Sequence, residues 1–350
     1  MYEQGVIRPP SEASSLLVRV TRNCPWNQCV FCPAYKGTRF SRRSVEEIER
    51  DIDAMANEYR GYSWVESAFL QDADSLILPT VDLVEILHYL KEKFPSLKRI
   101  TSYARARTVK RKSADEMIQF REAGLNRIHI GMESGSATVL KLIKKGLKPH
   151  EIVEGGRRVM EAGISLSEYI MPGIGGATYS EEHARETARM LNQVKPDFIR
   201  VRTFAMHPLS PMAKMVEEGA FVPMNDQEIV EEIRLLVDCL EPTHSYFSCN
   251  DFSLNLLMQV DGYLDEKKDA MLRELDDFLS LGEMQKKAYV LLQRSSYARY
   301  PVSVVRDEQV LKQVIPEVEK LEKSGKNGFD KYIQMLMSYQ LPQPQTENWT

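Results

Sequence analysis

Residues 97–132 read LKRITSYARARTVKRKSADEMIQFREAGLNRIHIGM and contain one complete strand–helix–strand unit. Two short segments rich in apolar and β-branched residues, 97–104 and 126–132, predict strands. Between them Ser113 begins a Ser-x-x-Glu capping box, which marks the start of a helix, and Gly124 suits the position just past its end. Because a helix connects them, the two strands are expected to lie parallel in one sheet.

The same alternation extends in both directions over most of the chain, and Ser44 begins a second Ser-x-x-Glu capping box. Six strands are expected, at residues 14–21, 64–70, 97–104, 126–132, 164–171 and 197–204. Since connections between parallel strands are right-handed, these units predict an α/β fold, a partial (β/α)6 barrel of the TIM type. After about residue 262 amphipathic helical segments replace the strands. We therefore expect a barrel domain over residues 1–250 and a mostly helical C-terminal extension over 251–350.

The composition is that of a globular protein, with 43% hydrophobic and 27% charged residues and a net charge of -4. The chain lacks the basic excess of nucleic-acid binders, so we expect no nucleic-acid partner. Residues 1–15 do not resemble a secretory signal, and no segment has the length of apolar residues that a membrane span needs. We expect a cytoplasmic protein without membrane contact. In that reducing compartment clustered cysteines are more typical of ligands or catalysts than of disulfides.

Three cysteines lie within nine residues of the loop after the first expected strand: Cys24, Cys29 and Cys32. Thiolates favour iron–sulfur clusters, zinc or copper(I). A structural zinc site needs four protein ligands, whereas Cys239 and Cys249 are distant in sequence and no histidine lies near the loop. Three ligands leave one iron of a [4Fe–4S] cluster open to a cofactor or substrate. The spacing favours such a cluster; a zinc site, or a thiol trio without any ligand, are the alternatives.

The loop resembles the cluster-binding motif of the radical S-adenosylmethionine (SAM) superfamily, Cys-x-x-x-Cys-x-aromatic-Cys. Phe31 fills the aromatic position, while four residues instead of three separate Cys24 from Cys29. The resemblance covers the expected barrel. It is greatest to the group that includes the elongator catalytic subunit, the methylthiotransferases and oxygen-independent coproporphyrinogen oxidase.

The resemblance also implies SAM-binding residues at the carboxyl ends of the strands, where a barrel gathers its site. The segment after the second strand occupies the place of a Gly-Gly-Glu motif that meets the SAM amino group. The segment after the fourth strand resembles a Glu-Ser-Gly segment facing the ribose or methionyl part, and a Gly-rich stretch after the fifth lies near the adenine. The implied cofactor-binding residues are Gln71, Asp72, Asp74, Glu133, Ser134, Gly173 and Gly175. On the sixth strand, Arg202 would bind an anionic group if it faces the barrel interior.

The chemistry that the resemblance implies is reductive cleavage of SAM at the [4Fe–4S] cluster. The resulting 5′-deoxyadenosyl radical would abstract a hydrogen atom from a substrate, expected to be a small molecule, with flavodoxin or ferredoxin as electron donor. The protein would then be an oxidoreductase in the broad sense, and no side chain is assigned a catalytic role. Two alternatives stay open: a non-catalytic cluster- or haem-handling protein of the same fold, and a tRNA-modifying radical SAM enzyme. Cys249 is a core thiol, a radical quencher or a further cluster ligand.

Overall fold

In the computed structural model, which describes residues 2–5, 7–60, 64–251, 253–296 and 298–342, strands and helices alternate as expected for an α/β protein. The chain forms two units by internal packing. The first comprises the described residues of Met1–Met132 and Lys145–Tyr169, together with Pro342. The second comprises those of Glu133–Lys144 and Ile170–Leu341.

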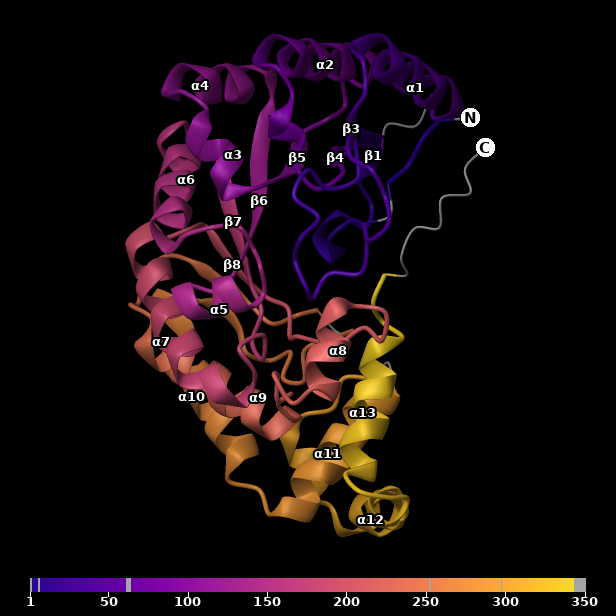
Figure 1. The fold of residues 1–350 in the computed structure, drawn as a ribbon, viewed down its shortest axis with the longest axis vertical. Coiled ribbons are helices and arrows are strands. Elements are labelled where there is room, and N and C mark those ends of the chain that lie inside the picture. Colours follow the sequence, from indigo (N-terminus) through magenta and orange to yellow (C-terminus); the bar gives the residue numbers. More distant parts are fainter. Residues whose placement is uncertain (1, 6, 61–63, 252, 297, 343–350) are drawn as a thin grey trace. The chain divides into compact units, whose positions relative to one another are not determined.

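The first unit contains parallel strands that neighbour one another in chain order (Figure 1). They are β1 (Leu16–Arg19), β4 (Ser67–Gln71), β5 (Arg99–Ala104), β6 (Leu125–Glu133) and β7 (Ser165–Ile170). In this register Arg19 lies opposite Gln71 at the carboxyl ends of β1 and β4. The core of β4 is buried on both faces, as is usual for parallel strands covered by helices.

Five helices of this unit flank the sheet, and local sequence explains where two of them begin. Ser44 Oγ accepts the backbone N–H of Glu47, and Ser113 Oγ accepts that of Glu116, so both predicted capping boxes are confirmed. Gly124 ends its helix with a left-handed φ of 115°. The helices are α1 (Val45–Glu58), α2 (Thr80–Lys93), α3 (Ala106–Arg111), α4 (Ala114–Ala123) and α6 (Pro149–Glu161).

Four short elements complete the first unit. Strands β2 (Thr21–Arg22) and β3 (Ser41–Arg42) pair antiparallel and enclose residues 23–40, the loop that carries the three clustered cysteines. Sequence patterns had not indicated this pair, since two residues are too few for a visible alternation. The 3₁₀ turns η1 (Pro10–Glu12) and η2 (Ser75–Ile77) follow the N-terminal segment and β4.

In the second unit, β8 (Phe198–Val201) pairs parallel with β9 (Tyr246–Ser248), and β9 pairs antiparallel with β10 (Asp261–Tyr263). The expected domain boundary at residue 250 thus lies between two paired strands. The helices of this unit are α5 (Ala137–Leu142), α7 (Gly176–Val194), α8 (Pro211–Glu217), α9 (Asp226–Cys239), α10 (Leu264–Leu279), α11 (Glu283–Ser295), α12 (Glu308–Lys323) and α13 (Gly328–Ser338), with η3 (Val302–Arg306) before α12.

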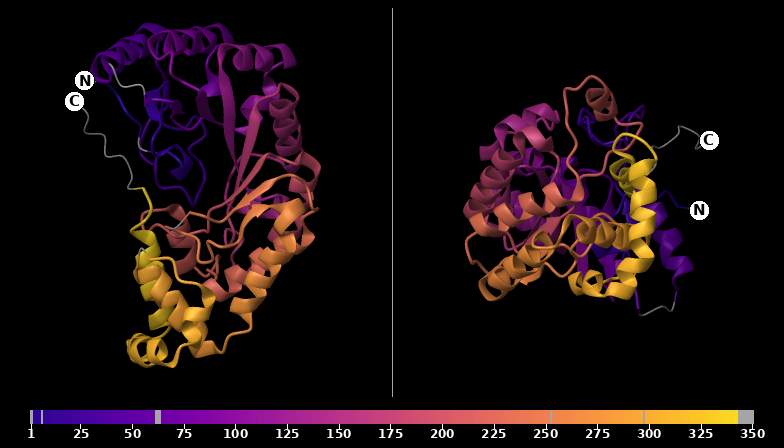
Figure 2. Two further views of the ribbon diagram at one scale, coloured as in Figure 1. Left: turned by 180° about the vertical axis from the view of Figure 1, so that it is seen from behind. Right: turned by 90° about the horizontal axis from the view of Figure 1, so that it is seen from below.

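The change of pattern after about residue 262 is confirmed, because only helices and one 3₁₀ turn follow β10 in the described chain. Figure 2 shows these helices in orange and yellow; α11, α12 and α13 pack on one another, while α10 packs on α9. Of all helices formed by the described residues, none combines the length and apolar character needed to cross a bilayer.

Helices α3 and α6 approach each other at a glycine. A Cβ atom added to Gly155 would lie 2.8 Å from the carbonyl oxygen of Ala106, closer than real Cβ contacts come. Gly155 on α6 therefore lets the backbone of α3 pack directly against it.

We expect Gly155→Ala to lower the free energy of unfolding by about 1–2 kcal/mol, although alanine favours an isolated helix over glycine by about 1 kcal/mol. The added methyl group must push α3 and α6 apart. Urea unfolding followed by circular dichroism measures the change. A gain in stability would show that the contact between α3 and α6 has room for the methyl group.

Candidate functional site

The loop of residues 23–40 is held in a defined shape by asparagines. Asn23 and Asn27 adopt left-handed φ values of 69° and 45°, a region that asparagine tolerates better than most residues. The Asn27 side chain donates to the carbonyl oxygen of Tyr35, and its backbone N–H points to Cys24 Sγ at 3.5 Å. The loop therefore folds back on itself around its first cysteine.

Cys24, Cys29 and Cys32 are reduced thiols and are all half-buried. The pKa of Cys32 is raised to about 11, chiefly by burial; the neighbouring Cys29 and Cys24 also raise it, while the Ala34 backbone N–H and the Lys145 ammonium lower it. Cys29 and Cys24 are thus close enough to Cys32 to disfavour its ionisation. Within the described residues, no three Cys, His, Asp or Glu side chains converge on a point that could hold a single metal ion.

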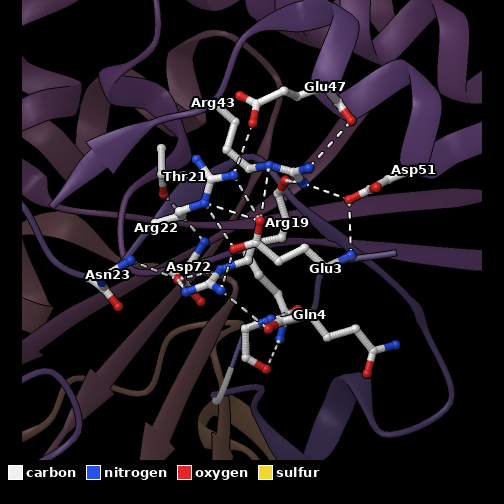
Figure 3. A network of polar contacts seen from close by, with 12 residues as sticks. Glu3, Gln4, Arg19, Thr21, Arg22, Asn23, Arg43, Glu47, Asp51 and Asp72 are labelled. Atoms are coloured by element: carbon white, nitrogen blue, oxygen red, sulfur yellow. Dashed lines mark hydrogen bonds and ion pairs between the residues drawn. The ribbon is translucent and has the colours of Figure 1, made fainter. Parts of the chain in front are cut away.

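Asp72 contacts Asn23, the first residue of the cysteine loop (Figure 3). Its Oδ2 accepts hydrogen bonds from Arg19 Nε at 3.0 Å and Nη2 at 2.8 Å, and from the backbone N–H of Asn23 at 2.8 Å. The Asp72 side chain is fully buried; burial raises its pKa and the Arg19 charge opposes that shift. The structure thus places Asp72 as a clamp on the residue that precedes Cys24.

The N-terminal segment joins this network (Figure 3). The Glu3 carboxylate lies 2.6 Å from Arg19 Nη1 and 2.8 Å from Arg22 Nη2. Gln71 Oε1 accepts the Gly5 N–H at 2.9 Å, and Gln71 Nε2 donates to Gly5 O at 3.3 Å. Sequence reasoning missed Arg19 and Glu3. An arginine within an apolar strand is the one signal that could have pointed to a buried ion pair.

Asp74 contacts residues at the start of α3. It is buried, which raises its pKa to about 6, and it accepts a hydrogen bond from Thr108 Oγ1 at 2.5 Å. The Arg105 backbone N–H also points to Asp74, and the Arg105 guanidinium lies 5.2 Å from the ring centroid of Trp26. A Cβ atom on Gly146 would lie 2.2 Å from that ring. Trp26 of the cysteine loop is therefore packed against two other segments of the unit.

In the second unit, the predicted Glu-Ser-Gly segment packs on α7. Glu133 has a left-handed φ of 61°, and its carbonyl accepts the Met171 N–H at 2.9 Å. The Gly135 N–H donates to Thr187 Oγ1 at 2.9 Å, and a Cβ atom on Gly135 would lie 2.3 Å from the Glu186 carbonyl oxygen. The glycine of this segment is required by the close approach of the helix.

The Gly-rich stretch after β7 leads into α7. Gly173 has a left-handed φ of 85° and donates its N–H to Glu232 Oε1 at 2.8 Å, while Gly175 precedes the first residue of α7. On the following strand segment, Arg202 is half-buried and its Nη1 lies 3.2 Å from Asp251 Oδ2. The charge of Arg202 is thus partly balanced by a residue that the sequence did not single out.

Two buried titratable residues contact these loops. His183 on α7 lies with Nδ1 2.8 Å from Ser134 Oγ, and its Nε2 lies 3.5 Å from Glu232 Oε1. Burial lowers the pKa of His183 to about 3 and raises that of Glu232 to about 7. Sequence reasoning missed both, because each occupies an inward position of an amphipathic helix, where apolar side chains are usual.

A family model matches the N-terminal part of the chain. Residues 18–190 match the family model described as the radical SAM superfamily. The chain is 27% identical over 224 residues to the tRNA-2-methylthio-N(6)-dimethylallyladenosine synthase of Bacillus subtilis, covering 60% of this chain and 41% of that protein. It is 26% identical over 195 residues to an uncharacterized methyltransferase of Pyrococcus horikoshii, covering 55% and 40%. The chain spans less than half the length of these two relatives.

The likeness to a solved structure can extend over nearly the whole chain. The cobalamin-dependent S-adenosylmethionine radical enzyme OxsB, with aqua-cobalamin and S-adenosylmethionine bound, is similar over 96% of this chain and 59% of that chain, with a TM-score of 0.50 and 14% identity. At this identity the likeness concerns the fold alone. It confirms the prediction of an α/β fold of the partial-barrel type followed by helices.

Arg19→Met should lower the free energy of unfolding by about 3 kcal/mol, because it leaves the Asp72 carboxylate buried without its cation. Urea unfolding measures the loss. The matched control is Lys93→Met, since Lys93 pairs with Asp53 where both side chains are partly exposed, 31% and 46%. Its cost should be far smaller, because exposed ion pairs contribute little to stability. Equal costs for the two variants would contradict a buried clamp at Asp72.

The stability of the protein should depend on the titration of Glu232. Its pKa is raised by burial from 4.5 to about 7, so its stabilising contribution is complete below pH 4.5 and is lost as the pH rises through about 7. Relative to Glu232→Gln, which stays neutral, the wild-type protein should lose on the order of 3 kcal/mol across this window. Urea unfolding midpoints at several pH values test this; since His183 is present in both proteins, parallel pH profiles would show that Glu232 titrates normally.

Proposed function

Because the chain belongs to the radical SAM superfamily, with residues 18–190 as the matched domain, we propose that it binds a [4Fe–4S] cluster and SAM and abstracts a hydrogen atom from a substrate. The observation that carries this proposal is the single loop on which Cys24, Cys29 and Cys32 lie half-buried, fixed at its base by Asp72. Membership of the superfamily makes the protein an enzyme; the reaction is the part we propose.

The residues of this loop fit an iron–sulfur cluster. Each cysteine of a cubane binds a different iron, so the three sulfurs need not meet at one point as they would around zinc. The thiols are near enough to raise the pKa of Cys32, and a bound metal deprotonates such thiols. The Asn27 N–H directed at Cys24 Sγ is the kind of contact that tunes cluster potentials.

When bound, the cluster would supply one electron, taken from a donor such as flavodoxin or ferredoxin, for the reductive cleavage of SAM that starts hydrogen abstraction. The chain's own residues bind and orient. Asp72 binds the backbone N–H of Asn23 and thereby holds the neighbouring residue, Cys24, in a fixed position. Lys145 places a positive charge near Cys32, which favours the thiolate over the thiol.

We assign the remaining cofactor contacts to the ends of the strands. Gln71, Asp72 and Asp74 act chiefly by holding neighbouring segments in place, since each side chain already binds protein groups. The backbone and side-chain groups of Glu133, Ser134, Gly173 and Gly175 are proposed to line the nucleoside part of SAM. Arg202, held by Asp251, is proposed to lie near an anionic group of cofactor or substrate.

Two substrate classes are in competition. The expectation of a small molecule came from the low basic content of the chain. The expectation that the protein has no nucleic-acid partner is not supported, because the chain is similar to a tRNA-2-methylthio-N(6)-dimethylallyladenosine synthase. A tRNA substrate is therefore the second candidate, and binding of tRNA that weakens steeply with salt would favour it.

The cluster assignment predicts the behaviour of single cysteine variants. After anaerobic reconstitution with iron and sulfide, the wild-type protein should hold about four irons per chain. With SAM and a strong reductant it should release 5′-deoxyadenosine, which chromatography detects. Cys24→Ser, Cys29→Ser and Cys32→Ser should each lose 5′-deoxyadenosine formation, because a serine oxygen is a poor cluster ligand.

The control is Cys239→Ser, since Cys239 lies on α9, in the second unit, and is not part of the cysteine loop. It should retain both the iron and the product. Tight zinc binding without iron uptake would overturn the cluster assignment. Iron uptake with intact SAM would instead favour a cluster-handling protein over a radical enzyme.

A further inference from the structure

We infer that His183 and Glu232 are positioning residues that hold the loop of Glu133–Ser136 and the loop at Gly173 in one fixed arrangement. This inference rests on the proposed function, because it gives the two residues a role in binding SAM. It concerns only the second unit, to which both loops and both helices belong.

Two hydrogen bonds, with one longer contact between them, connect the two loops as a polar chain. Ser134 Oγ accepts the N–H of Ser136 at 3.1 Å, so its own hydrogen is available for His183 Nδ1 at 2.8 Å. His183 Nδ1 is then an acceptor, and the ring proton lies on Nε2. That nitrogen faces Glu232 Oε1 at 3.5 Å, and the same oxygen accepts the Gly173 N–H at 2.8 Å.

A second contact strengthens the first half of the chain. Thr187, one turn after His183 on α7, accepts the Gly135 N–H at 2.9 Å and lies 3.4 Å from His183 Nδ1. The loop after β6 is thus bound to α7 at two residues that lie one helical turn apart, His183 and Thr187. The loop after β7 is bound to α9 through Glu232, and α7 and α9 pack directly against each other.

Burial makes this chain unusual for a contact between two helices. Ser134, His183 and Thr187 are fully buried, and Glu232 is 2% exposed. Polar groups removed from water destabilise a protein unless they are well hydrogen-bonded, and apolar side chains would fill the same space at lower cost. In the described residues His183 Nε2 has no well-aligned hydrogen bond. The contact between His183 and Glu232, at the centre of this chain, is incomplete. The chain therefore fixes the positions of the two loops and adds little to the stability of the fold.

The function of such a chain is to set where two cofactor loops stand relative to each other. Residues behind the groups that touch a cofactor commonly change its affinity tenfold to a hundredfold when removed (about 1.4–2.8 kcal/mol). The incomplete contact between His183 and Glu232 is closed by a small shift of either loop, as happens when a ligand orders a site. Neither residue needs to touch SAM for this effect.

The test measures SAM affinity and cluster content in the same reconstituted protein. His183→Phe and Glu232→Leu fill the space but remove the polar chain, so each should weaken SAM binding in equilibrium dialysis by about tenfold or more. The double variant should bind no more weakly than the weaker single variant, because both interrupt one chain. Iron per chain and cluster absorption should stay at the wild-type level, since the cysteine loop belongs to the other unit.

Two further variants separate positioning from folding. Glu232→Gln keeps an oxygen for the Gly173 N–H and should restore most of the affinity lost in Glu232→Leu; it also serves if the apolar variants do not fold. Asn192→Leu is the matched control, because Asn192 links α7 to the end of α9 away from both loops. Its SAM affinity should be that of the wild type even if it unfolds more readily.

The outcomes decide separately between the two proposals. Additive effects of His183→Phe and Glu232→Leu, SAM affinities equal to the wild type, or an equal loss in Asn192→Leu would overturn the positioning role while leaving the radical SAM reaction intact. Absence of cluster or of SAM binding in the wild-type protein would instead overturn the proposed function itself.

Discussion

The guanidinium of Arg19 and the carboxylate of Asp72 balance each other's charge at the carboxyl ends of β1 and β4, where water has no access. Removing either partner leaves an uncompensated buried charge, so the pair holds both strand ends together. Since Asp72 also binds the N–H of Asn23, the pair fixes the start of the cysteine loop. Through Glu3 the same constraint reaches the N-terminal segment (Figure 3). Three distant stretches of sequence thereby share one electrostatic anchor.

Local signals in the sequence were sufficient for much of the fold. Strand and helix periods, and the capping boxes at Ser44 and Ser113, depend on residues only a few positions apart, and the structure confirms them. The three cysteines were equally visible, because the candidate ligands lie on one loop. The pair of β2 and β3 escaped notice because its two strands are too short to show a pattern.

Contacts between distant residues could not be foreseen in the same way. Asp72 and Gln71 were assigned to SAM by their place after a strand; what the sequence did not indicate is that Arg19 and Asn23 bind Asp72 Oδ2 and that Gly5 binds Gln71. His183 and Glu232 likewise resemble ordinary polar residues of amphipathic helices. Whether such a residue faces solvent or a buried loop depends on the rotation of its helix, which periodicity defines only within a wide arc.

The pairing of β2 with β3 holds the two ends of the cysteine loop side by side. For a flexible loop closed at its base, the entropic cost of closure rises only slowly with each added residue. The loop can therefore differ in length from its counterparts in other proteins while its two ends stay in place. Such tolerance accounts for the extra residue between Cys24 and Cys29, which changes the spacing within the loop but not the strands that close it.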